Sequence, residues 1–244
     1  MEFDFKKHPS DIARAAHDFL DGLNVKNKSK HYEVLQLFFS YLMRDFSNCE
    51  ESDSGELLVI VNWHDFYGGV IDNFINIFMV RNVMSDAGLR KKSVSVMRQF
   101  IKWSYKKQFF DQEHFDEYLD AFAASSNQEI DRLEKLTSLF YRLHSPNPGA
   151  WARGEVGQVE SINDVAEPEE IEEGYMTFKS SKGLQGFFNT FEDNVDVGPV
   201  MLSKEILQLL KSGDIVNLTA GRYGNNWRVL ETGNVYAAGT GAFQ

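Results

Sequence analysis

The sequence predicts an α+β protein of two domains, with an all-α N-terminal domain of four to five helices and a small β-barrel C-terminal domain. Up to about residue 145, apolar residues repeat at three- and four-residue spacing, as they do in amphipathic helices. Beyond that point the pattern changes to short alternating runs separated by Gly- and Asn-containing turns, which is typical of short strands. The Pro- and Gly-rich segment 145–149 separates the two patterns, because no helix is expected to cross it.

These patterns predict a helical domain over residues 1–145, an acidic, Pro/Gly-punctuated linker or first strand over residues 146–174, and a barrel module over residues 175–244. Eight acidic residues and no basic residue lie between Glu155 and Glu173. A segment so strongly charged is expected to be solvated rather than buried.

The helical domain is expected to begin with a helix that Ser10 caps and that ends at Gly22. The acidic stretch 47–56 reads as a loop, and Asn62 could cap a later helix. The remaining predicted helices cover about 31–46, from Asn62 to 78, 89–110, 115–122 and 130–143.

The barrel module is expected to contain five or six short strands and one helical turn, which Ser203 would cap. The hairpin formed by segments 213–218 and 221–229 resembles, in its pattern, the hairpin of SH3-like small barrels. The predicted strands are 155–162, 174–178, 200–202, 214–220, 226–230 and 234–237.

Composition excludes several classes of protein. Cys49 is the single cysteine, so an intramolecular disulfide and a cysteine-only metal cluster are ruled out. No run of 18 apolar residues exists, so no membrane partner is expected, and a reducing, cytoplasmic location is the natural expectation. The sequence has no phosphate-binding or dinucleotide-binding glycine motif and no paired-histidine zinc motif, so we expect no cofactor and no metal. The net charge of −11 argues against general coating of nucleic acid, but it does not exclude a local basic surface.

Such a surface is predicted on the helix from about Leu89 to Phe110. Between Leu89 and Gln108 there are seven basic residues and no acidic one. At 100° per residue, the basic side chains form a stripe opposite a broad apolar side, and such a stripe can neutralise several phosphates. A merely solvated helix face is the alternative interpretation. The candidate nucleic-acid-binding residues are Lys91, Lys92, Ser95, Arg98, Lys102 and Lys106.

The helix Leu89-Arg90-Lys91-Lys92-Ser93, continuing through Met97-Arg98-Gln99-Phe100-Ile101-Lys102-Trp103, carries a resemblance to a known family. Together with the helices around it, over about residues 30–125, it resembles the N-terminal core-binding (SAM-like) domain of phage-type tyrosine recombinases, or integrases. The resemblance implies a helical domain that clasps duplex DNA during DNA recombination through backbone phosphates. By position, it assigns the phosphate contacts to Lys91, Ser95, Arg98 and Lys102.

The catalytic half of that family is missing. No histidine in this chain is followed three residues later by arginine, and after residue 145 the only arginines are Arg153, Arg222 and Arg228. The β-rich C-terminal part also cannot supply a mostly helical catalytic domain. We therefore expect a protein without recombinase activity and name no catalytic residue.

The predicted barrel carries a second candidate surface on the hairpin near its end. Arg222, Tyr223, Trp227 and Arg228 could stack on a peptide or a single-stranded nucleic acid, or Trp227 could belong to the core and Arg222 be solvated. The leading hypothesis is a non-catalytic DNA-binding protein with duplex DNA as partner. The alternative is a protein–protein interaction adaptor that uses the helical domain and the barrel without DNA.

Overall fold

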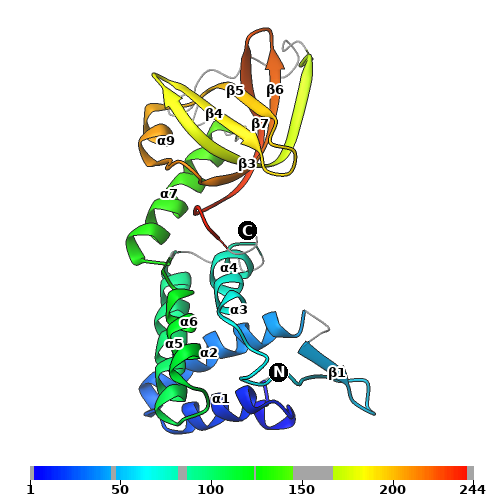
Figure 1. The fold of residues 1–244 in the computed structure, drawn as a ribbon, viewed down its shortest axis with the longest axis vertical. Coiled ribbons are helices and arrows are strands. Elements are labelled where there is room, and N and C mark those ends of the chain that lie inside the picture. Colours follow the sequence, from blue (N-terminus) through cyan, green and yellow to red (C-terminus); the bar gives the residue numbers. More distant parts are fainter. Residues whose placement is uncertain (1–2, 45–47, 82–86, 124, 145–166, 241–244) are drawn as a thin grey trace. The chain divides into compact units, whose positions relative to one another are not determined.

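The computed structural model describes residues 3–44, 48–81, 87–123, 125–144 and 167–240 (Figure 1). The described residues divide into two compact units, one up to Asn127 and the other from Gln128 to Thr240. Most of the expected acidic linker, with the strand expected at 155–162, lies outside the described residues. The division falls at the first residue of helix α7 (Asn127–His144) and not at the expected boundary after residue 145, because α7 packs against the barrel.

The first unit is helical except for one short hairpin. Ser10 caps α1 as expected, since its Oγ accepts hydrogen bonds from the backbone N–H groups of Ile12 and Ala13 at 3.2 and 3.3 Å. Gly22 is the C-cap of the same helix. The elements are η1 (Phe5–Lys7), α1 (Asp11–Asp21), α2 (Val25–Leu42), β1 (Cys49–Glu51), β2 (Leu57–Val59), α3 (Gly68–Asn73), the π-helix η3 (Phe74–Phe78), α4 (Met79–Arg81), α5 (Ala87–Lys106) and α6 (Gln112–Asp120).

Three local expectations for this unit are wrong. Helix α2 begins at Val25 rather than near residue 31, because the Asn24 side chain accepts a hydrogen bond from the backbone of the next turn and caps it. Asn62 caps no helix, because its Oδ1 accepts from the backbone N–H of Asp11 at 3.0 Å, and the next helix starts at Gly68. The acidic stretch 47–56 is not only a loop, since it contributes strand β1.

Aromatic rings fill the core of the first unit. Phe38 meets Phe74 edge-on with ring centroids 5.2 Å apart, and Trp63 lies 5.7 Å from Phe100. Tyr118 is fully buried and still satisfies its hydroxyl group, which donates to the carbonyl of Phe66 at 2.8 Å. The rings therefore join α2, η3, α5 and α6 into one core.

The second unit is a closed five-stranded barrel. Its strands are β3 (Glu170–Lys182), β4 (Gln185–Thr190), β5 (Asp196–Met201), β6 (Ile215–Tyr223) and β7 (Asn226–Tyr236), and the short helix α9 (Lys204–Leu209) lies between β5 and β6 (Figure 1). Around the barrel the order is β3-β4-β5-β7-β6, with β5 and β7 parallel and every other neighbouring pair antiparallel. This order, with a helix between the third and fourth strands, has the Greek-key pattern of OB-fold barrels, and the expected SH3-like arrangement is not confirmed.

The long first strand, β3, closes the barrel because it pairs with two strands, β4 and β6. Its residues 170–177 pair with β6, and its residues 176–182 pair with β4. Gly174 lies in this strand with φ of +125°, a conformation that side chains rarely adopt. A glycine there lets the strand bend as it passes from one half of the barrel to the other.

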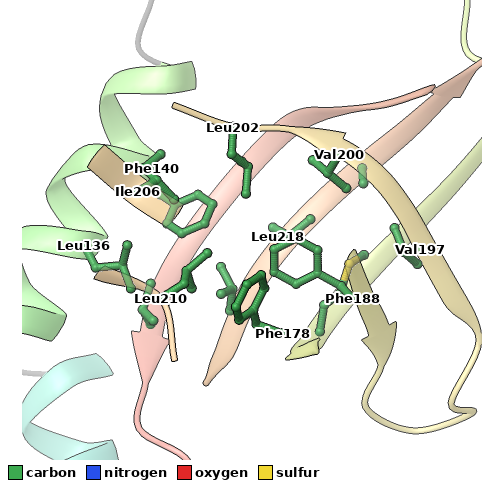
Figure 2. Close-up of a cluster of buried hydrophobic side chains, with 14 of the residues drawn as sticks. Leu136, Phe140, Phe178, Phe188, Val197, Val200, Leu202, Ile206, Leu210 and Leu218 are labelled. Atoms are coloured by element: carbon green, nitrogen blue, oxygen red, sulfur yellow. The ribbon is translucent and has the colours of Figure 1, made fainter. Parts of the chain in front are cut away.

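Helices α7 and α9 complete the barrel core (Figure 2). Leu136 and Phe140 of α7 and Ile206 of α9 join the inward-facing residues of the strands, among them Phe178 and Phe188. Ser203 caps α9 as expected, since its Oγ accepts from the backbone N–H of Ile206 at 3.2 Å. The helix predicted over 130–143 is confirmed as part of α7, and its apolar side packs into the barrel core.

A buried ion pair fastens α7 to the strand end where β6 begins. Arg132 donates to both carboxylate oxygens of Asp214, at 2.6 and 2.9 Å, and also to Glu129 and to the carbonyl of Leu209. The side chains of Arg132 and Asp214 are only 10% and 1% exposed. Burial opposes the charge of Arg132, but the two carboxylates outweigh it and raise the pKa of the guanidinium above its usual value.

Candidate nucleic-acid interface

Helix α5 carries all six predicted nucleic-acid-binding residues. One side of the helix is buried, including Val94, Met97, Phe100 and Ile101, so the helix has a fixed orientation in the first unit. The predicted stripe lies on the remaining side. We call its members, Lys91, Lys92, Ser95, Arg98, Lys102 and Lys106, the basic face.

Half of the basic face is engaged within the protein. The ammonium group of Lys92 pairs with the carboxylate of Glu33 on α2, and Lys91 is partly buried and also has an interaction partner. Arg98 is exposed but anchored, because its Nη2 donates to the Phe122 carbonyl at 3.2 Å and its guanidinium lies 5.1 Å from the Phe122 ring centre. These contacts hold the cations in place, but they reduce the charge free to meet a phosphate.

The other half is open to solvent. Ser95, Lys102 and Lys106 are exposed along the outer side of α5, with Lys102 and Lys106 one turn apart. Between Ser95 and Lys102 the amide of Gln99 donates to both the Ser95 carbonyl and the Ser95 hydroxyl, at 3.1 and 3.2 Å. The exposed strip is therefore basic and polar, with no acidic side chain contributed by α5 itself.

Helix α2 adds cations that sequence reasoning did not include. It packs beside α5, where the buried His31 places Nε2 3.2 Å from Oε1 of Gln99. Lys26 and Lys30 are exposed and share the helical side of Glu33, which pairs with α5. The i, i+4 spacing of these two lysines was visible in the sequence, but their helix had been expected to start after them.

A groove opens where α5 ends and the chain turns into α6. It has a volume of about 670 Å³ and is lined by Tyr105, Lys106, Gln108, Phe110, Asp111 and Gln112. The turn is made by Gln108, whose φ of +62° lies in the left-handed region that most residues avoid. Lys106 therefore belongs both to the basic face and to this groove, which sequence reasoning missed because the turn is not encoded by glycine.

An ion pair borders the groove at the start of α6. Asp111 caps that helix, accepting from the backbone N–H of His114 at 3.1 Å, and the same carboxylate oxygen lies 2.7 Å from Nδ1 of the His114 ring. The hydrogen bond with Asp111 raises the pKa of His114, and the bond with His114 lowers the pKa of Asp111. The carboxylate at the rim thus keeps its negative charge at neutral pH.

The structure separates the four residues of the predicted barrel surface. Trp227 is 5% exposed and belongs to the barrel core. Arg222 forms ion pairs with Glu169 and Glu170 at 2.9 and 2.8 Å. The Arg228 guanidinium lies over the Tyr223 ring, 5.1 Å from its centre. Tyr223 and Arg228 therefore form one stacked pair at the hairpin, and Trp227 presents no ring to a ligand.

The described residues place no group of three or more His, Cys, Asp or Glu side chains where they could hold a metal ion. Within the same part of the chain, every helix is too short or too polar to span a lipid bilayer.

The sequence matches no protein-family model and no curated protein, and the structure matches no solved structure.

Proposed function

We propose that this protein is a non-catalytic DNA-binding protein that contacts duplex phosphates through the basic face of α5. The observation that carries the proposal is the exposed row of Lys102 and Lys106 on a rigidly packed helix, extended by Lys26 and Lys30 of α2. Lysines on a helix held by its apolar side can meet phosphates without reorganising the fold.

The resemblance of residues 30–125 to the core-binding domain of tyrosine recombinases supports the same assignment. In that resemblance α5 is the helix whose basic residues lie on the DNA backbone. We also propose that the helices of the first unit have a SAM-like arrangement, as the resemblance implies. Binding through phosphates would position the protein on DNA with little reading of base sequence.

Because the net charge of the protein is −11, DNA binding must depend on a local basic surface, and the test must show which residues form it. The test is salt-dependent binding of the full chain to duplex DNA, measured by fluorescence anisotropy of a labelled duplex. A double variant, Lys102→Gln with Lys106→Gln, removes two exposed cations from the basic face. A matched control, Lys6→Gln with Arg14→Gln, removes two exposed cations at η1 and α1 of the same unit.

Each phosphate contact contributes roughly 0.9 to the slope of log affinity against log salt. The basic-face variant should therefore lose about 1.8 from that slope and bind most weakly, relative to wild type, at low salt. The control should keep the wild-type slope. Equal losses in both variants would mean a diffuse attraction, and the named interface would be wrong.

A protein–protein interaction adaptor is the second candidate, and one observation on the barrel favours it. Leu184 and Met201 are 49% and 48% exposed. They lie close together, because Met201 pairs with Gln185 across β4 and β5 and the N–H of Leu202 donates to the Leu184 carbonyl at 2.9 Å. Exposed apolar neighbours, one in the β3–β4 turn and one at the end of β5, suit a protein partner better than a phosphate backbone. Absence of any salt-dependent duplex binding would put this function first.

A further inference from the structure

We propose that the groove at the end of α5 binds a single unpaired nucleotide at the end of a DNA duplex, with guanine preferred over thymine. This inference rests on the proposed function, because the duplex would lie on the basic face that leads to the groove. The groove, of about 670 Å³, is open to solvent, so it offers a wall on which a base can stack rather than an enclosed pocket.

The groove offers an aromatic wall that is already in position. The ring of Tyr105 stacks on Phe115, with centroids 4.3 Å apart and planes 16° apart, and its hydroxyl donates to Oε1 of Gln112 at 2.6 Å. The ring of Phe110 packs against the ring of Trp63, with centroids 4.8 Å apart. Because neighbouring rings and a hydrogen bond already hold these two side chains in place, a base that stacks on them orders few side chains, which favours binding.

The polar groups of the groove differ at its two ends. Lys106 provides a cation at the α5 end, where a phosphate of the bound strand would lie. Asp111 provides an exposed carboxylate at the α6 end. Its Oδ1 accepts from the backbone N–H and the ring of His114, and a carboxylate has about four acceptor positions, so it can accept further hydrogen bonds from a ligand. A carboxylate oxygen only accepts hydrogen bonds, so it selects a base that donates them.

This requirement distinguishes the bases. The Watson–Crick edge of guanine presents a ring N–H and an amino group, and both can donate to a carboxylate. Thymine presents one N–H between two carbonyl oxygens, and those oxygens repel a carboxylate. A base inside the duplex is paired and stacked and cannot enter the groove without being flipped out, whereas an unpaired end can enter at little cost.

The test compares three duplexes of the same sequence with the full chain at low salt: blunt-ended, with a one-nucleotide dG overhang, and with a one-nucleotide dT overhang. Each overhang is prepared on the 3′ and on the 5′ end. Stacking of one base is worth about 1 kcal/mol or more, so the dG overhang should bind at least about fivefold more tightly than the blunt duplex. The dT overhang should gain less.

The variant Asp111→Asn isolates the carboxylate. Asparagine is as good a helix cap as aspartate, so α6 should remain folded. This variant should lose the preference for dG over dT and keep its affinity for the blunt duplex. Asp65→Asn is the matched control, because Asp65 is an exposed acid of the same unit away from the groove lining, and it should keep the preference.

The outcomes separate this inference from the proposed function. Equal affinity for blunt and overhanging duplexes would overturn the nucleotide site and leave duplex binding intact. If no duplex binds, the proposed function fails, and the groove is then tested with deoxyguanosine monophosphate alone by amide NMR. Shifts confined to residues 105–112 would support the site, and their absence would overturn it.

Discussion

Replacing Asp214 with alanine should be among the most damaging single changes in the barrel unit. Asp214 accepts from both terminal nitrogens of Arg132 and, at 2.8 Å, from the backbone N–H of Lys211. Removing one partner of a buried ion pair costs about 3–5 kcal/mol, because the other charge is left buried. Arg132 keeps Glu129 and the Leu209 carbonyl, so we expect the lower end, about 3 kcal/mol.

That loss corresponds to a fall in melting temperature of roughly 10 °C or more for a unit of this size. The assay is urea denaturation of the full chain followed by amide NMR signals of β6 in the barrel, with signals of α5 reporting on the first unit. The free energy of unfolding should fall for β6 and stay unchanged for α5.

The control is Arg222→Ala, which breaks the exposed pairs with Glu169 and Glu170 in the same barrel. Solvent and salt screen such pairs, so this change should cost about 0–1 kcal/mol. A double change of Arg132→Met with Asp214→Leu should cost less than Asp214→Ala, since both charges of the buried pair are removed and Glu129 keeps its ion pair with Lys211. If Asp214→Ala costs no more than Arg222→Ala, the reasoning from an unpaired buried charge is refuted.

Three further predictions concern the first unit. Tyr118→Phe should lower the free energy of unfolding by about 1–2 kcal/mol, measured by urea denaturation, because the carbonyls of the 63–66 turn lose their donor; no loss would contradict the hydrogen bonds assigned. His114 should titrate above pH 6.5 by NMR, and its contribution to stability should be complete below that pH and disappear as the pH rises through the raised pKa. In Asp111→Asn the His114 pKa should fall back toward its ordinary value, and an unchanged pKa would contradict the pairing. Ser10→Ala should destabilise the unit by about 1 kcal/mol in thermal denaturation through loss of the α1 cap, whereas an unchanged melting temperature would contradict that role.

The position of the basic side chains on α5 could be predicted from the sequence. Their contacts with other parts of the protein could not. The wheel position of Lys102 and Lys106 follows from helical geometry alone, and the structure leaves both exposed. The pairing of Lys92 with Glu33 and the anchoring of Arg98 at Phe122 join residues 59 and 24 positions apart. No local pattern encodes such contacts, because they depend on how helices pack.

Features that arise within a few residues could be predicted from the amino-acid sequence. They are the change from a helical to a strand pattern, the caps Ser10 and Ser203, and the amphipathic side of α7. Tertiary structure alone decided which partner each apolar side meets. It placed α7 in the barrel unit, inserted β7 between β5 and β6, and turned Trp227 into the core. The periodicity of apolar residues shows that one face of an element must be buried, but not what buries it. Strand order and helix docking depend on closing the barrel and filling its core, and both requirements couple residues that are distant in the chain.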